Sequence, residues 1–162
     1  MVEKNLDDLF YETLKDMYYA ERQIFRSLPK MAKGAKASEL KQAFTHHREE
    51  TEGQIQRLEK VFEVINKPAR GKTCEAIKGI LEEGSENLET FENSVALDAG
   101  LIADGQAVEH YEMARYGALI SWAKQLGMRE VAELLNENLK EEKAADQLLT
   151  RLAEKTVNKE AA

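Results

Sequence analysis

Apolar residues recur at three- and four-residue spacings along four long segments of the chain, which predicts four amphipathic helices. The first series begins at Leu6 and ends near Gly34. Ser38 is a candidate N-cap for the second helix, which Asn66 and Pro68 end. Only a few residues separate these two helices, so they are expected to form an antiparallel hairpin.

The second half of the chain predicts another hairpin. Its first helix begins between residues 88 and 93 and is closed by Gly127, and its second helix follows at once. A polar connection over residues 67–73 precedes a short helix over residues 74–83, which residues 84–85 are expected to end. Two hairpins joined by one long crossover predict an all-α, ferritin-like four-helix bundle with a short extra helix.

Four glutamates interrupt the apolar faces of these helices, namely Glu21, Glu50, Glu112 and Glu142. An ionised carboxylate taken out of water without a partner is costly, and no lysine or arginine lies on the same faces at these levels. A bound cation is the simplest explanation. The alternative is that each helix rotates to place its glutamate at a solvated edge, which requires four separate rotations.

Hairpin geometry tests this hypothesis, because two residues equally distant from an antiparallel turn lie at the same height. Glu21 and Glu50 are centred on the first predicted turn, and Glu112 and Glu142 are centred on Gly127. A weak internal repeat at an offset of 91 to 92 residues aligns the two pairs. Packing the hairpins together would bring all four carboxylates into one layer.

Further donors lie one turn from these four positions. Glu109 precedes Glu112 on the same face and is expected to be a fifth ligand. Gln54 and Asp146 lie four residues after Glu50 and Glu142, and they either bind the metal or orient the groups that do. His47 lies on the same face, but a single histidine inside a bundle is more often a hydrogen-bonded structural group, and we expect that role.

The segments around these residues resemble those of the YciE/YciF bacterial stress proteins, a ferritin-like family (domain of unknown function 892). The resemblance covers nearly the whole chain, and it rests on residues 18–23, 46–51, 108–112 and 141–146. It implies a four-helix, often dimeric, cytoplasmic protein that is induced under general or osmotic stress and has a dinuclear metal centre. It implies no defined biochemical activity.

The sequence departs from the wider ferritin-like pattern of one Glu from each of two helices and Glu-x-x-His from each of the other two. Gly53 and Ala145 stand three residues after Glu50 and Glu142, where the histidines would be. A site completed by Gln54 and Asp146 is nearly all oxygen, which weakens selectivity for iron and leaves manganese, calcium or magnesium as alternatives.

Composition narrows the class of protein. We expect one domain over residues 1–162, because the chain is too short for two ordinary domains. The formal charge of −7 and the dispersed basic residues argue against nucleic acid and anionic membranes as partners. A single cysteine and an N-terminus without a secretory signal predict a cytoplasmic protein, and no apolar run is long enough to span a membrane.

We therefore predict a stress-response protein that holds two divalent metal ions, iron first and manganese second, between Glu21, Glu50, Glu109, Glu112 and Glu142. Gln54 and Asp146 complete or support this set, and reaction with oxygen or peroxide follows from the resemblance alone. The rival interpretation is a metal-free structural or interaction module that forms a helical dimer. An iron-storage cage is a third alternative. A homodimer is the expected assembly, and whether the protein is an enzyme is left open.

Overall fold

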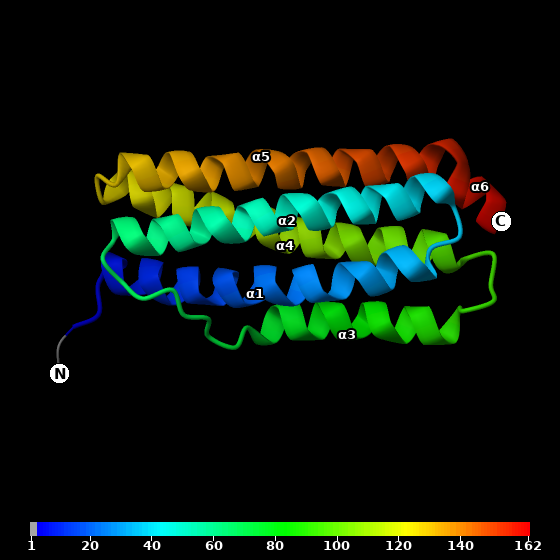
Figure 1. Ribbon diagram of the computed structural model, residues 1–162, viewed down its shortest axis with the longest axis horizontal. Coiled ribbons are helices and arrows are strands. Elements are labelled where there is room, and N and C mark those ends of the chain that lie inside the picture. The colour runs from blue at the N-terminus through cyan, green and yellow to red at the C-terminus, as the bar shows by residue number, and fades with distance from the viewer. Residues whose placement is uncertain (1–2) are drawn as a thin grey trace.

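The computed structural model describes residues 3–162 as a bundle of four long helices with a fifth helix on its outside (Figure 1). The four long helices are α1 (Leu6–Gly34), α2 (Ser38–Val64), α4 (Leu97–Gln125) and α5 (Arg129–Leu152). α3 (Glu75–Thr90) lies in the crossover and packs against α4 and α1. A π-helical segment (Ala153–Val157) and the short α6 (Asn158–Ala161) follow α5. The predicted ferritin-like four-helix bundle with an extra crossover helix is confirmed.

The starts of α1 and α2 are stabilised in different ways. Asn5 and Asp8 form a reciprocal capping box at the start of α1. At the start of α2 the expected cap at Ser38 is wrong, because Ala37 occupies the N-cap position and has no capping side chain. The carboxylate of Asp98, from the first turn of α4, accepts hydrogen bonds from the backbone N–H groups of Lys36 and Ala37 at 2.8 and 2.7 Å. A long-range contact thus replaces the local cap.

The crossover differs from the prediction at the end of α3 and at the start of α4. This helix continues through residues 84–85 to Thr90, and α4 begins at Leu97 rather than between residues 88 and 93. Gly84 is buried, and a Cβ atom placed on it would lie 3.7 Å from Cβ of Asp104 on α4. This glycine serves close packing of the two helices instead of breaking α3.

The apolar core consists of two clusters. One contains residues near the α1–α2 turn, including Ile24, Phe44 and Leu101. The other contains residues from the opposite half of the bundle, including Phe62 and Leu119. On α2, α4 and α5 the glutamates fall between the two clusters along the chain, and on α1 Glu21 lies three residues after Tyr18, the last α1 member of the second cluster. A polar layer thus lies where the two clusters meet.

Among residues 3–162, none of the helices combines the length and the apolar character that crossing a membrane requires.

Candidate metal centre

The polar layer contains acidic side chains that are almost completely withdrawn from solvent. Glu21, Glu112 and Glu142 are 0% exposed, and Glu109 is 2% exposed. Single ligand atoms of His47, Glu109, Glu112 and Glu142 all lie within 4.8 Å of one another. The alternative of a solvated edge is therefore wrong for these glutamates. Two hairpins bring their acids to one depth, as the spacing from the turns predicts.

His47 from α2 lies at the centre of this group. Its Nε2 atom is 3.0 Å from Glu109 Oε1 and 3.7 Å from Glu142 Oε2. Its Nδ1 atom is 3.2 Å from Glu50 Oε2. The Thr51 hydroxyl donates to the His47 backbone carbonyl at 2.7 Å and lies on the same buried face. The expectation that His47 is hydrogen-bonded is met, and its imidazole also offers a ligand atom to the group.

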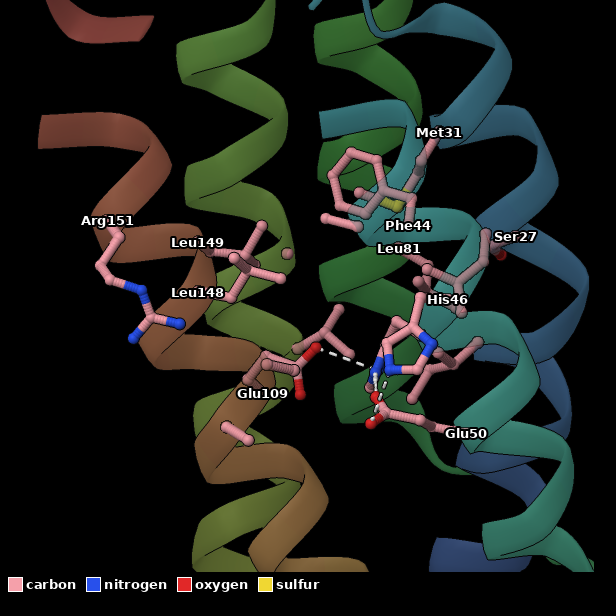
Figure 2. A pocket seen from close by; sticks show the side chains of 18 residues that line it. Ser27, Met31, Phe44, His46, Glu50, Leu81, Glu109, Leu148, Leu149 and Arg151 are labelled. Carbon is pink, nitrogen blue, oxygen red and sulfur yellow. Dashed lines mark hydrogen bonds and ion pairs between the residues drawn. The ribbon is translucent and has the colours of Figure 1, made fainter. Parts of the chain in front are cut away.

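Glu50 lies at the edge of the layer, with 21% of its side chain exposed. Its carboxylate is held between two histidines of α2, because His46 Nε2 is 3.3 Å from Oε1 and His47 Nδ1 is 3.2 Å from Oε2 (Figure 2). Burial acts to raise the pKa of Glu50, but the hydrogen bond and charge of His47 outweigh it and lower this pKa below its usual value. Glu50 thus stays ionised beside the buried group.

Gln54 and Asp146 take different positions. Gln54 is fully buried and donates from Nε2 to Glu141 at 3.1 Å, while its Oε1 atom has no hydrogen-bond partner among residues 3–162. Asp146 accepts from Gln106 at 3.2 Å and lies 3.4 Å from His110 Nδ1. The Oε1 atom of Gln54 is therefore free to bind a metal ion in the layer, whereas Asp146 lies outside the group of four.

A chain of hydrogen bonds holds Glu21 from the other side. The hydroxyl of Tyr116, a fully buried side chain, donates to Glu21. Asn138 Nδ2 donates to the Tyr116 oxygen at 3.1 Å, and Arg57 donates to the Asn138 oxygen at 2.9 Å. These contacts orient one carboxylate oxygen of Glu21 and leave the other without a partner.

Eight buried side-chain nitrogen and oxygen atoms make no hydrogen bond of good geometry within residues 3–162, and every one belongs to this layer; one of them, His47 Nε2, has only its ion-pair contacts to Glu109 and Glu142. They come from the following side chains: Glu21, His47, Gln54, Glu109, Glu112 and Glu142. Buried polar atoms in folded proteins are nearly always paired, so a concentration of unpaired ligand atoms calls for a specific explanation. A bound cation satisfies carboxylate oxygens and an imidazole nitrogen together.

The electrostatics of the metal-free layer agree with this explanation. Burial raises the pKa of Glu21 to about 7. Burial and the neighbouring acids raise the pKa of Glu112 and of Glu142 well above the usual value. Burial alone would lower the pKa of His47, but Glu109 and Glu142 raise it well above its usual range. Without a metal ion, the layer is neutralised by protons.

The metal-free protein should therefore lose stability as the pH rises from 6 to 8. Glu21 has a pKa of 4.5 when unfolded and about 7 when folded, so its cost is absent below 4.5 and grows as the pH rises to 7. His47 acts in the same direction, because a raised histidine pKa stabilises the fold at low pH and this contribution is lost as the pH rises. Glu21 alone accounts for about 1.4 kcal/mol over this interval.

Calorimetry in the presence of a chelator measures this effect as a fall in melting temperature of about 3 to 6 °C, if one kcal/mol corresponds to 2–4 °C for a domain of this size. A melting temperature that stays flat or rises over the same interval would contradict the assignment of buried, proton-neutralised acids.

This chain matches a known family and a curated protein over nearly its whole length. The family model described as "Domain of unknown function (DUF892)" matches residues 5–162. The chain belongs to the DUF892 family. Protein YciF of Escherichia coli strain K12 is 46% identical over 159 residues, which are 98% of this chain and 96% of YciF. The resemblance to the YciE/YciF proteins is thereby confirmed.

Solved structures of other proteins have the same fold. The E. coli stress protein YciF superposes with a TM-score of 0.92, at 46% identity over 97% of this chain and 99% of that one. YcfI of Rhodopseudomonas palustris, whose description proposes a structural role, gives 0.89 at 44% identity over 91% and 94%. A Xanthomonas campestris protein gives 0.75 at 22% identity over 96% and 94%, which shows a shared fold alone.

Proposed function

We propose that this DUF892 protein binds two divalent metal ions in the polar layer. The observation that supports the proposal is the set of eight buried ligand atoms without a hydrogen bond in one layer of the bundle. Two divalent ions carry a charge of +4, which four or five carboxylates balance. Glu21, Glu109, Glu112, Glu142 and His47 would hold the ions, because their atoms converge and are shielded from water.

The remaining candidates have lesser roles in this proposal. Glu50 would close the exposed edge of the site, and the free Oε1 atom of Gln54 is available to either ion. Asp146 would support the site from outside the group of four, where it contacts Gln106 and His110.

Iron is the metal we propose first, and manganese second. A site with one imidazole and several carboxylates suits both, whereas an all-oxygen set would favour calcium or magnesium more strongly. His47 therefore increases the selectivity that oxygen donors alone would lack. When bound, a redox-active pair of ions would supply electrons to oxygen or peroxide. The chain itself contributes an apolar enclosure, the hydrogen bond from Tyr116 that orients Glu21, and an imidazole held by Glu50.

The cellular role that we propose is taken from the relatives. YciF of E. coli is described as a stress protein, and we infer a comparable stress-related role for this chain in the cytoplasm, as a homodimer. The rival function is a metal-free structural module, which the description of the R. palustris relative favours. The two functions differ in one measurable respect, because a structural module needs no cation in its core.

Metal analysis of the untagged protein tests the proposal directly. After anaerobic loading with iron(II) and removal of excess metal, the wild type should retain two equivalents per chain. The double variant Glu109→Gln/Glu142→Gln should retain less than half an equivalent, because it removes two ligands and two balancing charges. Glu82→Gln/Glu83→Gln on α3 makes the same charge change outside the layer and should bind like the wild type. Less than about one equivalent of iron or manganese in the loaded wild type would overturn the proposal.

A further inference from the structure

A largely apolar cavity of about 220 Å³ lies next to the polar layer. It is enclosed by α1, α2, α4 and α5 and is touched by Leu81 of α3. Figure 2 shows Met31, Phe44 and Leu149 along one part of its wall, and Glu50 and Glu109 at the end that meets the layer. The cavity is therefore largely apolar, and it ends at ion-paired groups in which His46 and His47 contact the two glutamates.

The cavity opens toward solvent between α2 and α5. An outer hollow there shares four lining residues with the cavity, which are Ala43, His46, Leu148 and Arg151. The hollow also contains Lys155 and one acid, Glu39. Neither Arg151 nor Lys155 forms an ion pair with any residue in the described range 3–162. The mouth thus presents two uncommitted cations against one carboxylate.

We propose that this cavity binds a single-chain amphiphile with an anionic head, of the class of medium-chain carboxylates. The chain would lie in the apolar cavity with its end toward Glu109, and the carboxylate would lie at the mouth beside Arg151. At the inner end Glu50 and Glu109 are already ion-paired with His47, and the apolar wall gives an anionic head no partner. Arg151 at the mouth is the cation that is free to bind the head, so this orientation is the one that the contacts favour. The inference does not depend on bound metal.

The cavity volume sets the length of the chain. A cavity of about 150 Å³ holds the six carbons of benzene, so 220 Å³ corresponds by proportion to about nine carbons. Decanoate, with nine carbons beyond its carboxyl group, is the matching probe. Each methylene that leaves water strengthens binding about fourfold, so hexanoate should bind at least about 100-fold more weakly.

Calorimetric titration of the full-length protein with decanoate, as purified and after chelation, should show saturable binding of one molecule per chain in both samples. Methyl resonances of Ile24, Val108 and Leu149 should shift, because these side chains line the cavity. Decylamine should bind more weakly than decanoate. Absence of saturable binding, or shifts confined to other residues, would overturn the proposal.

Two variants test the mouth and the passage. Arg151→Gln removes the charge beside the head and should weaken decanoate binding about tenfold, as expected for a lost charge-assisted hydrogen bond. Arg129→Gln, an exposed arginine at the start of the same helix, is the matched control and should leave the affinity unchanged. Ala43→Leu narrows the junction between hollow and cavity and should weaken binding at least tenfold. Equal affinities for the two arginine variants would refute the assigned position of the head, whether or not Ala43→Leu folds.

Discussion

Loading the metal-free protein with iron(II) or manganese(II) should raise its melting temperature by about 10 to 20 °C. A ligand present at 100 times its dissociation constant stabilises the folded state by about 2.7 kcal/mol per site, and two sites together give about 5 kcal/mol. For a domain of this size, one kcal/mol corresponds to about 2–4 °C. The unfolded chain lacks the converged ligands, so nearly all of the binding free energy appears as stability.

The shift should itself depend on pH, because metal and protons compete for the same groups. Glu112, Glu142 and His47 are held protonated in the metal-free layer by their raised pKa values, and each must lose a proton before it binds a cation. The gap in melting temperature between loaded and metal-free protein should therefore widen from pH 6 to pH 8. Stability of the metal-free form falls over the same range, which widens the gap further.

Anaerobic differential scanning calorimetry, with and without a chelator, measures both effects. The double variant Glu109→Gln/Glu142→Gln is the control, and its melting temperature should not respond to metal. A wild-type transition that is indifferent to metal and to chelation at both pH values would contradict a metal centre. It would instead favour the structural module, whose buried acids are simply protonated.

Glu112→Gln should have opposite effects on the metal-free fold and on metal binding. Both carboxylate oxygens of Glu112 are buried without a partner, and the side chain is 0% exposed. Keeping Glu112 protonated in the fold at pH 8, well above its pKa of 4.5 in the unfolded chain, costs free energy that a neutral glutamine avoids, so the substitution should stabilise the metal-free fold by at least about 1 kcal/mol. The same substitution removes a ligand from the layer and should weaken metal binding by at least about 100-fold.

Urea denaturation of the chelated protein at pH 8 measures the first effect, and anaerobic iron(II) titration measures the second. Glu82→Gln, on the outside of α3, is the matched substitution and should change stability by less than about 0.5 kcal/mol. A chelated Glu112→Gln variant that is less stable than the wild type would mean that the carboxylate has a structural partner. Unchanged metal affinity would remove Glu112 from the ligand set. The expected pair of results is typical of a site that is kept at the expense of stability.

Local pattern was sufficient for the helices and for the depth of the acidic layer. Apolar spacing placed the start of α1 at Leu6 and its end at Gly34, and it placed the second turn at Gly127, where the backbone has a positive φ of 72°. Counting residues from each turn then placed Glu21, Glu112 and Glu142 at one height. This works because the rise per residue is the same in every α-helix, so sequence distance converts directly into height.

Counting residues from a turn does not predict how far a helix is rotated about its own axis. One residue corresponds to about 100° of rotation, and His47 and Glu50 are three residues apart, so a small turn of α2 decides which of them faces the centre. Packing of α2 against α1 and α5 placed His47 inside and Glu50 at the edge. Asp146 was likewise turned toward Gln106, outside the group of four.

The sequence by itself thus determined the number of long helices, their hairpin pairing and the level at which acids interrupt the core, since each depends on spacing along one chain segment. Tertiary structure alone decided three features: the direction of each polar side chain, the extension of α3 past Gly84, and the apolar cavity beside the layer. These depend on how the surfaces of separate helices fit together. Contacts between residues far apart in the chain determine that fit, and they leave no periodic signal in the sequence.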